Sequence, residues 1–119
     1  MNDTTTTVAQ LKKIVSDFVQ ERDWQQFHSP KNLSMGIVGE ATELMEKFFW
    51  MSLQESYASV TDNRQEIEDE AADVLFMLLA FCNASSIDIA AAFEKKVAQT
   101  KQKYPVEKSK GVYTKNDKL

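Results

Sequence analysis

A run of nine apolar residues, 74–82 (VLFMLLAFC), constrains the fold of this chain more than any other feature. The apolar spacing before it predicts a helix that begins near Thr61 or Asp62, where either side chain can cap it, and extends to about Asn83. A helix that is apolar on every side belongs in the centre of a bundle, or at the junction between bundles of an oligomer, because a surface helix keeps one solvated face. The run therefore predicts a packed helical core.

Chain length and composition favour a single all-α domain. With 119 residues, the chain is long enough for one compact domain and too short for two. Three glycines and two prolines leave few turn residues for an all-β fold. The lone Cys82 lies in the apolar run and cannot form an intramolecular disulfide, so we interpret it as a buried, unreactive thiol in a reducing compartment.

Three further helices are predicted from apolar residues at spacings of three and four. The residues that define them are Val8, Leu11, Ile14, Val15 and Phe18; then Leu33, Ile37, Ala41, Leu44 and Phe48; and then Ile87, Ala91, Val97 and Tyr104. The first of these helices should run to about Arg22. The second should begin at Ser29 and Pro30 and end near Trp50 or Leu53, before a loop of roughly ten residues.

The two ends of the chain differ from this helical part. Residues 1–7 are polar and threonine-rich, and we predict that they form a disordered, frayed tail. Pro105 should stop the last helix, and residues 106–119 form a basic, lysine-rich tail without a helical stripe. The predicted architecture is thus a four-helix bundle over residues 8–105.

Charge and hydropathy narrow the partners that we expect. The net charge of −4 argues against binding to a nucleic-acid backbone, which relies on a basic surface. No apolar stretch approaches the roughly 18 residues that span a bilayer, and the polar start does not resemble a signal peptide. We therefore expect a soluble, cytoplasmic protein that binds neither nucleic acid nor membrane. A small anionic substrate can still bind through metal ions.

Two pairs of acidic residues occupy positions that the helical pattern assigns to apolar stripes. Glu40 lies within the stripe of one helix, with Glu43 one turn further on. Glu70 and Asp73 stand in the same relation to the stripe of the next predicted helix. An ionised carboxylate in a low-dielectric interior costs several kcal/mol even after relaxation, so these four carboxylates need cationic partners.

Metal ions fit this requirement better than side-chain cations do. Lys47 and Arg64 are the cations nearest the acid pairs in the sequence, and neither falls between them in the helical pattern. Oxygen ligands without histidine favour Mg²⁺ or Mn²⁺ over zinc. The competing interpretation is an ordinary solvated acidic face, which suits the remaining acids of these helices. These are Glu46, Glu66, Glu68 and Asp69.

Residues 39–46 (GEATELME) and 70–75 (EAADVL) resemble the two signature motifs of the MazG-type pyrophosphohydrolases. The pattern of that family is Gly-Glu-x-x-Glu-Leu on one helix, followed by Glu-x-x-Asp-Val on another. Residues 22–33 (RDWQQFHSPKNL) are similar to the stretch that precedes the first motif in the dCTP-pyrophosphatase branch. Together with residues 49–50 and 103–105, the likeness covers residues 8–105.

The resemblance implies an enzyme that hydrolyses a nucleoside triphosphate between its α and β phosphates, giving a nucleoside monophosphate and pyrophosphate. It implies Mg²⁺ as cofactor, dCTP or a related deoxynucleotide as substrate, and a homo-oligomer, a tetramer built as two dimers. Glu40, Glu43, Glu70 and Asp73 match the metal-ligand positions of the family. Metal ions between these carboxylates and the anionic substrate can also activate water and stabilise developing charge.

For the base, the resemblance implies a pocket that contains Trp24, His28 and Trp50, whose flat rings suit stacking on a heterocycle. The alternative is that the two tryptophans are core residues and that His28 has a structural role beside a helix start. Both interpretations remain open at the level of sequence.

The phosphate end departs from the family pattern Lys-x-x-x-Asn-x-x-Arg-Tyr-Pro. This chain has Lys96, then Thr100 in place of the amide and Lys103 in place of the guanidinium. Lysine meets phosphate as a point charge without a bidentate fork, so Lys96 is the firmest candidate for a phosphate contact. The branch also often has a lysine where this chain has Met51. In the basic tail, the residues that can close over the triphosphate are Lys108, Lys110 and Tyr113.

A second interpretation of the sequence is a protein of another class. A non-catalytic helical module can use the same acidic helices as a metal, nucleotide or assembly site. Release of pyrophosphate from nucleotides with Mg²⁺ distinguishes the two, because a module binds without turnover. A helical nucleic-acid binder would need a basic face that the sequence does not offer.

Overall fold

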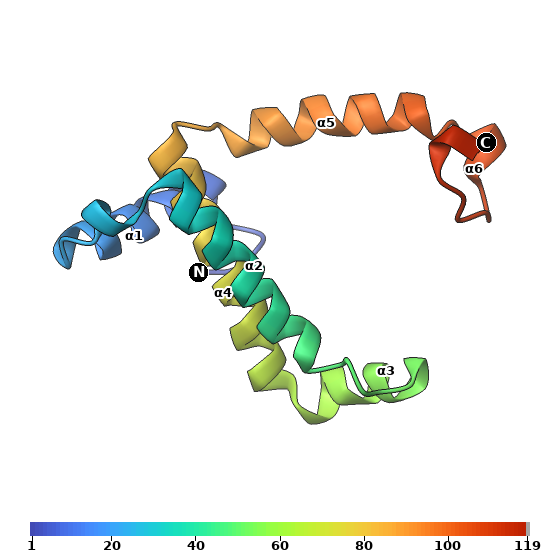
Figure 1. Ribbon diagram of the computed structural model, residues 1–119, viewed down its shortest axis with the longest axis horizontal. Helices are drawn as coiled ribbons and strands as arrows, with labels where there is room; N and C mark the ends of the chain where they lie inside the picture. Colours follow the sequence, from blue (N-terminus) through green and yellow to red (C-terminus); the bar gives the residue numbers. More distant parts are fainter. Residues whose placement is uncertain (119) are drawn as a thin grey trace. The chain divides into compact units, whose positions relative to one another are not determined.

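The computed structural model describes residues 1–118, and this part of the chain is helical without strands (Figure 1). The elements follow in the order α1 (Val8–Glu21), η1 (Gln25–Phe27), α2 (Pro30–Glu46), α3 (Leu53–Asp62), α4 (Arg64–Ser85), α5 (Ile89–Lys103), α6 (Val106–Ser109) and η2 (Asn116–Lys118), where η denotes a 3₁₀ helix. The all-α prediction is confirmed. The predicted count of four helices is wrong, because residues 1–118 form six α-helices.

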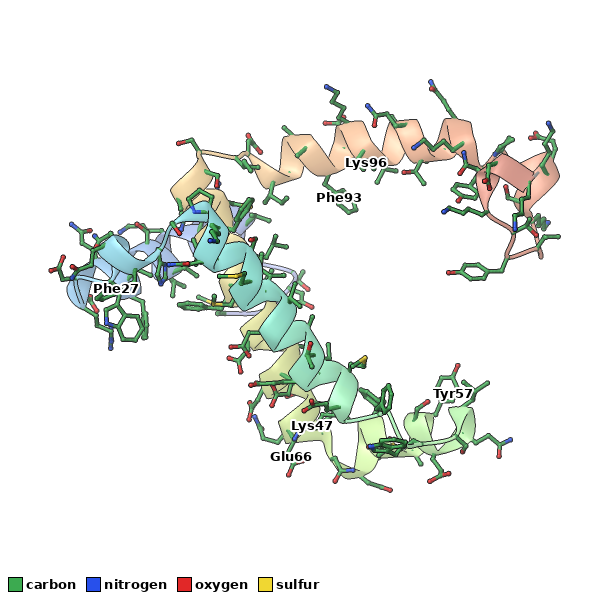
Figure 2. All side chains as sticks on the ribbon, viewed as in Figure 1. Phe27, Lys47, Tyr57, Glu66, Phe93 and Lys96 are labelled. Atoms are coloured by element: carbon green, nitrogen blue, oxygen red, sulfur yellow. The ribbon has the colours of Figure 1, made fainter. Side chains whose placement is uncertain are left out.

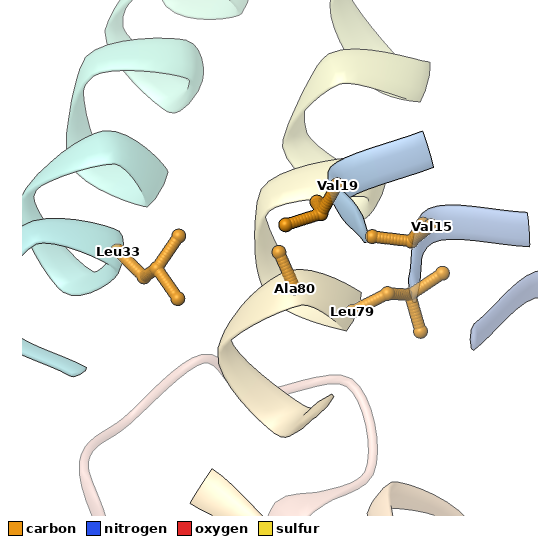
Figure 3. Close-up of a cluster of buried hydrophobic side chains, with 5 residues drawn as sticks. All are labelled: Val15, Val19, Leu33, Leu79 and Ala80. Atoms are coloured by element: carbon orange, nitrogen blue, oxygen red, sulfur yellow. The ribbon is translucent and has the colours of Figure 1, made fainter. Parts of the chain in front are cut away.

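The chain divides into two compact units, one of residues 1–86 and one that starts at residue 87. In the first unit, α1 and α2 pack against α4, and α2 runs alongside α4 (Figure 1). The residues of the buried cluster in Figure 3 are Val15 and Val19 of α1, Leu33 of α2, and Leu79 and Ala80 of α4. Each fully buried aliphatic side chain contributes about 1.5–3 kcal/mol, so this cluster holds the three helices together.

The register between α2 and α4 decides which side chains meet. Gly36 lies against Met77 near one end of the contact, and Lys47 pairs with Glu66 at the other. The step from Gly36 forward to Lys47 equals the step from Met77 back to Glu66, as expected for antiparallel helices in continuous contact. Residues three or four apart share one helix face, so the acids between these two contacts face one another.

The predicted starts of two helices are confirmed in detail. The N–H of Asn32 donates a hydrogen bond of 3.1 Å to Ser29 Oγ, and Pro30 occupies the first position of α2. Thr7 and Gln10 form a capping box at the start of α1. Such caps satisfy N–H groups that have no partner within the helix and stabilise it by about 1 kcal/mol.

The segment between α2 and α4 differs from the predicted loop. Residues 53–62 form α3, which begins with a capping box between Ser52 and Glu55. The predicted caps Thr61 and Asp62 are therefore wrong, since both lie inside α3 and α4 starts after Asn63. Helix α3 is largely solvated and buries only the small Ser59, so it lacks the apolar stripe by which the other helices were predicted.

Residues 1–7, predicted to be frayed, contain a turn in the structure. The side chain of Asn2 accepts hydrogen bonds from the N–H groups of Thr4 and Thr5, at 2.9 and 3.0 Å. An asparagine side chain that accepts from the backbone in this way mimics a turn.

The second unit contains α5, α6 and η2. Asp88 caps α5 by accepting a hydrogen bond from the N–H of Ala91, and the helix ends before Pro105, as predicted. The basic tail is not devoid of helix, because α6 and η2 lie within it. The N–H of Asn116 donates to the hydroxyl of Tyr104 at 3.2 Å, which ties the end of the tail to the end of α5.

Most of the apolar run 74–82 is buried or half-buried within a single chain. Leu79, Ala80 and the predicted buried thiol Cys82 are buried, whereas Leu75 is 43% exposed. Within residues 1–118, no single helix is long and apolar enough to cross a membrane; α4 and α5 pass that test by length and composition only when they are counted together.

Candidate metal centre

The structure brings the four predicted carboxylates together. Glu40 and Glu43 come from α2, and Glu70 and Asp73 come from the facing side of α4. One oxygen atom from each residue can be chosen so that all four lie within 4.8 Å of one another. The convergence follows from the constant register of the two helices, which places two acid pairs with the same three-residue spacing opposite each other.

Two of these carboxylates contain buried atoms without a partner. The Oε2 atoms of Glu40 and Glu70 are shielded from solvent and accept no hydrogen bond, while the Glu43 and Asp73 side chains are exposed. A buried carboxylate oxygen without a hydrogen bond or counter-charge is strongly unfavourable. The centre is thus closed on the side of Glu40 and Glu70 and open to solvent on the side of the other two.

Burial and the nearby carboxylates also affect the protonation of Glu40 and Glu70. Burial, followed by the charge of Glu43 and a hydrogen bond that a protonated carboxyl can share with it, raises the pKa of Glu40 above its ordinary value. Burial and the interaction with Glu43 also raise the pKa of Glu70, an effect that the positive charge of Lys47 opposes. The folded chain therefore holds negative charges that repel one another, which is the condition that a bound cation relieves.

Side-chain cations do not neutralise the centre. In the described part of the chain, no lysine or arginine forms an ion pair with any of its four carboxylates. Lys47 Nζ lies 3.5 Å from Glu66 Oε2, and Arg64 Nε lies 2.8 Å from Glu68 Oε1. Glu66, which the sequence suggested was simply solvated, is instead the next residue on the face of α4 that carries Glu70. Its spacing of four residues from Glu70 was the available signal.

These observations fit a hard divalent cation. The donor set consists of carboxylate oxygens only, it includes two buried oxygen atoms without partners, and none of its carboxylates forms an ion pair with a lysine or arginine in the described residues. Mg²⁺ and Mn²⁺ prefer such oxygen ligands. Glu40, Glu43, Glu70 and Asp73 are the residues that would hold the metal.

Trp24 and His28 lie at the N-terminal end of α2, away from the carboxylates. Trp24 is 42% exposed and packs edge-on against Phe18, with ring centroids 5.7 Å apart. His28 lines a pocket of about 310 Å³ between α1 and α4, together with Gln25 and Asn83. The two polar side chains are residues that the sequence did not single out, because nothing in their spacing marks them.

Trp50 lies beyond the opposite end of α2 and is 90% exposed, with its ring edge-on to Phe49. Helix α2 has 17 residues, so its ends are about 25 Å apart. Figure 2 shows this separation through Phe27, next to His28 in the sequence, and Lys47, three residues before Trp50. The structure therefore does not bring Trp50 together with His28 within one chain.

The candidates for phosphate contacts belong to the second unit. Lys96 and Thr100 lie one turn apart on α5, and the Thr100 hydroxyl donates to the Lys96 carbonyl oxygen at 2.9 Å. That hydroxyl is therefore engaged by its own helix, at a position where the family pattern has an amide. Lys103 is the last residue of α5, Lys110 follows α6, and the Tyr113 side chain is fully exposed.

Comparison with known proteins agrees with the all-helical fold and identifies the family. The MazG-like family model matches residues 36–119, which include both pairs. The chain is 36% identical over 107 residues to dCTP pyrophosphatase 1 of Rattus norvegicus, covering 88% of this chain and 63% of that protein. It is 33% identical over 101 residues to dCTP pyrophosphatase 1 of Homo sapiens, covering 83% and 59%. The chain thus spans less than two thirds of the length of these curated relatives.

A solved structure gives a closer match in length. The crystal structure of a pyrophosphatase from Archaeoglobus fulgidus superposes with a TM-score of 0.80 at 33% sequence identity. The match covers 88% of this chain and 98% of that one. The fold and the facing acid pairs define an all-helical protein with a cluster of four carboxylates that could hold a metal ion. More specifically, the chain belongs to the MazG-like family.

Proposed function

We propose that this protein hydrolyses nucleoside triphosphates to nucleoside monophosphates and pyrophosphate, with Mg²⁺ as cofactor. The observation that supports this most is the convergence of four carboxylates, two of which contain buried oxygen atoms without partners. The relatives named dCTP pyrophosphatase 1 and the pyrophosphatase from Archaeoglobus fulgidus support the same reaction class.

The reaction breaks the bond between the α phosphorus and the oxygen that bridges to the β phosphate. A water oxygen forms the new bond to phosphorus, the pyrophosphate leaves with the bridging oxygen, and the proton of the water passes to a base or to solvent. Bound Mg²⁺ supplies activation of the water and compensation of the developing charge. The four carboxylates would hold the metal, and an exposed one, Glu43 or Asp73, is accessible to orient the water.

For the substrate, we propose dCTP or a related deoxynucleotide, with Trp24, His28 and Trp50 as base-binding residues. Stacking on tryptophan supplies roughly 1–3 kcal/mol per base and tolerates every base, so hydrogen bonds must decide the identity of the base. Lys96, Lys103, Lys110 and Tyr113 remain proposed contacts to the triphosphate.

The separation of Trp50 from His28 along α2 gives the proposal a further consequence. If all three base-binding residues act on one nucleotide, a second copy of the chain must supply Trp50 or the other two. A homo-oligomer, proposed as a tetramer of two dimers, meets this requirement. Exposed apolar side chains on and beyond α2 support it, because large apolar patches mark interaction surfaces. They are Met35, Val38, Met45, Phe49 and Trp50.

A panel of nucleotides tests the proposed function. Deoxynucleoside and ribonucleoside triphosphates are incubated with the protein and Mg²⁺, and the release of pyrophosphate and of monophosphate is measured. We expect both products in equal amounts, preferential turnover of dCTP or a related deoxynucleotide, and loss of turnover with a chelator. Nucleotide binding without turnover would instead favour a non-catalytic module, and light scattering that shows only monomers would exclude the site shared between chains.

A further inference from the structure

Lys47 and Glu66 form the next pair of facing residues beyond Glu43 and Glu70 along the contact between α2 and α4. Lys47, the C-cap residue of α2, lies four residues after Glu43, and Glu66 lies four residues before Glu70 on α4. Lys47 therefore meets Glu66 beside the pair that includes Glu70. The facing carboxylates of the metal centre thus end in a pair of opposite charges, with 3.5 Å between Lys47 Nζ and Glu66 Oε2.

This ion pair differs from the others in the structure. Lys13–Asp17 and Arg64–Glu68 join residues one turn apart on a single helix, at 2.8 Å each. Lys47–Glu66 instead joins the end of α2 to α4, and at 3.5 Å its contact is longer than those two. A partly solvated pair of this length contributes little to stability, so Lys47 can exchange Glu66 for a stronger anionic partner at small cost.

The ammonium group is also placed to act on the centre. The Lys47 side chain is 34% exposed against 66% for Glu66, so the cation is the more enclosed partner. Glu43 lies one turn before Lys47, and Glu70 lies one turn after Glu66, so the ammonium group lies beside the facing carboxylates of Glu43 and Glu70. An anionic substrate bound at the metal centre would therefore have the ammonium group of Lys47 at one end of the site, next to Glu43 and Glu70.

We propose that Lys47 is a phosphate-binding residue, which Glu66 holds at the end of the metal centre until the ammonium group contacts a phosphate of the bound triphosphate. This inference rests on the proposed function and adds to it a residue from outside the acid pairs. Lysine suits the role because its ammonium group is a mobile point charge with three donors.

The position of Lys47 predicts two effects of opposite sign. Its charge attracts phosphate, and the same charge repels Mg²⁺ at the neighbouring carboxylates. Lys47→Met should therefore tighten Mg²⁺ binding to the nucleotide-free protein by about threefold, because one nearby like charge is removed. It should weaken binding of a non-hydrolysable α,β-methylene deoxynucleoside triphosphate by about tenfold, because a charge-assisted contact is lost.

Two further variants, one at Glu66 and one at Lys47, make this test more specific. Glu66→Gln should act in the reverse direction, with weaker Mg²⁺ binding and tighter binding of the analogue, because it removes the acid that holds and offsets Lys47. Lys47→Arg keeps the charge and should retain most of the parental affinity for the analogue. Raising the salt concentration should reduce the difference between parent and Lys47→Met, since salt screens charges that are not fully buried.

Arg64→Met is the matched control, because it removes a cation and an ion pair from α4, the helix of Glu66, without changing the facing acids of the metal centre. Both affinities are measured by titration calorimetry on the full chain, with circular dichroism to confirm folding.

Equal effects of Lys47→Met and Arg64→Met would overturn the proposal in favour of a general charge effect. Weakening of both Mg²⁺ and analogue binding by Lys47→Met would overturn it in favour of a structural ion pair. If Lys47→Met does not fold, Glu66→Gln tests the proposal instead. Weaker Mg²⁺ binding together with tighter analogue binding supports it, and any other combination overturns it.

Failure of this inference and failure of the proposed function have different signatures. Neither binding measurement needs turnover. A parent protein that releases pyrophosphate while Lys47→Met keeps parental affinities would refute the role of Lys47 alone. A parent protein that binds Mg²⁺ and analogue with the predicted dependence on Lys47, yet releases no pyrophosphate, would refute the hydrolysis and support the phosphate contact.

Discussion

Gly36 of α2 lies against the terminal methyl group of Met77 on α4, so closely that a Cβ atom on residue 36 would overlap it. This contact lies one step along the α2–α4 register from Glu40 and Asp73. A larger residue at position 36 would have to displace the end of the Met77 side chain next to the candidate metal centre.

The two glycines of α2 provide a matched pair for testing this contact. A Cβ atom on Gly39 meets nothing within 4 Å in the chain. Gly39→Ala should therefore stabilise the protein by about 0.5–1 kcal/mol through helix propensity. Gly36→Ala gains the same propensity but must displace Met77, so we expect it to be less stable than Gly39→Ala by roughly 1–2 kcal/mol.

Urea unfolding at one fixed protein concentration measures both free energies of unfolding. Met77→Ala removes packing against the core in any background, but in a double-mutant cycle it should cost less in Gly36→Ala than in the parent, because the overlapping group is then absent. Equal stability of the two glycine variants would show that Met77 moves aside freely. A loss of stability in Gly39→Ala would show that another chain covers this face.

Glu70→Gln tests the metal centre with almost no change in side-chain volume. We expect activity to fall at least about a hundredfold, together with a large loss of Mg²⁺ affinity, because an amide is a weaker ligand than a carboxylate. The metal-free variant should nevertheless be more stable than the metal-free parent, since one repelling charge is removed. Glu68→Gln on the same helix is the control and should retain activity. Parental activity in Glu70→Gln would refute the assignment.

The raised pKa values of Glu40 and Glu70 predict how the stability of the metal-free protein depends on pH. A carboxyl whose pKa is higher in the folded than in the unfolded chain binds its proton more tightly when folded. Its contribution is complete below the ordinary value of 4.5 and is lost as pH rises through the folded value. In the presence of a chelator, the contribution of these two carboxyls should therefore make the melting temperature higher near pH 5 than near pH 7.

Saturating Mg²⁺ should change this dependence, because protons and metal compete for the same oxygen atoms. The stabilisation by Mg²⁺ should be larger near pH 7 than near pH 5. Calorimetric melting of the parent and of Glu70→Gln, with and without Mg²⁺, isolates the contribution of one carboxyl from the rest of the protein. An identical pH dependence of the two metal-free proteins would contradict the prediction.

The acid pairs were predictable from sequence because their positions are periodic. Glu40 and Glu70 interrupt apolar stripes, and periodicity alone states which side of each helix they occupy. The pairing of Lys47 with Glu66 was not predicted, because it depends on the register between two helices. Such a register depends on how the side chains of both helices pack together, as Leu33 of α2 and Ala80 of α4 do in the core, and neither helix encodes it by itself.

Helix α3 was missed for a different reason. Periodicity detects a helix only when one face is buried, and α3 keeps Leu53 and Tyr57 exposed and buries only Ser59. The capping box of Ser52 and Glu55 was legible in the sequence and would have identified the helix start. Local capping chemistry is thus the better guide to a solvated helix.

The position of the base-binding residues leads to the last prediction, a complementation experiment. His28 and Trp50 lie at opposite ends of α2, about 25 Å apart along a helix of 17 residues, so a site that uses both must combine two chains. His28→Ala and Trp50→Ala should each lower kcat/KM for dCTP. When the two variants are mixed under conditions that exchange subunits, sites with both native side chains form again, at roughly a quarter of all sites for random two-fold pairing. The activity of the mixture should therefore exceed that of either variant alone. Activity that stays at the average of the two variants, with subunit exchange verified by mass spectrometry, would show that the base pocket lies within one chain and that one of these residues is not part of it.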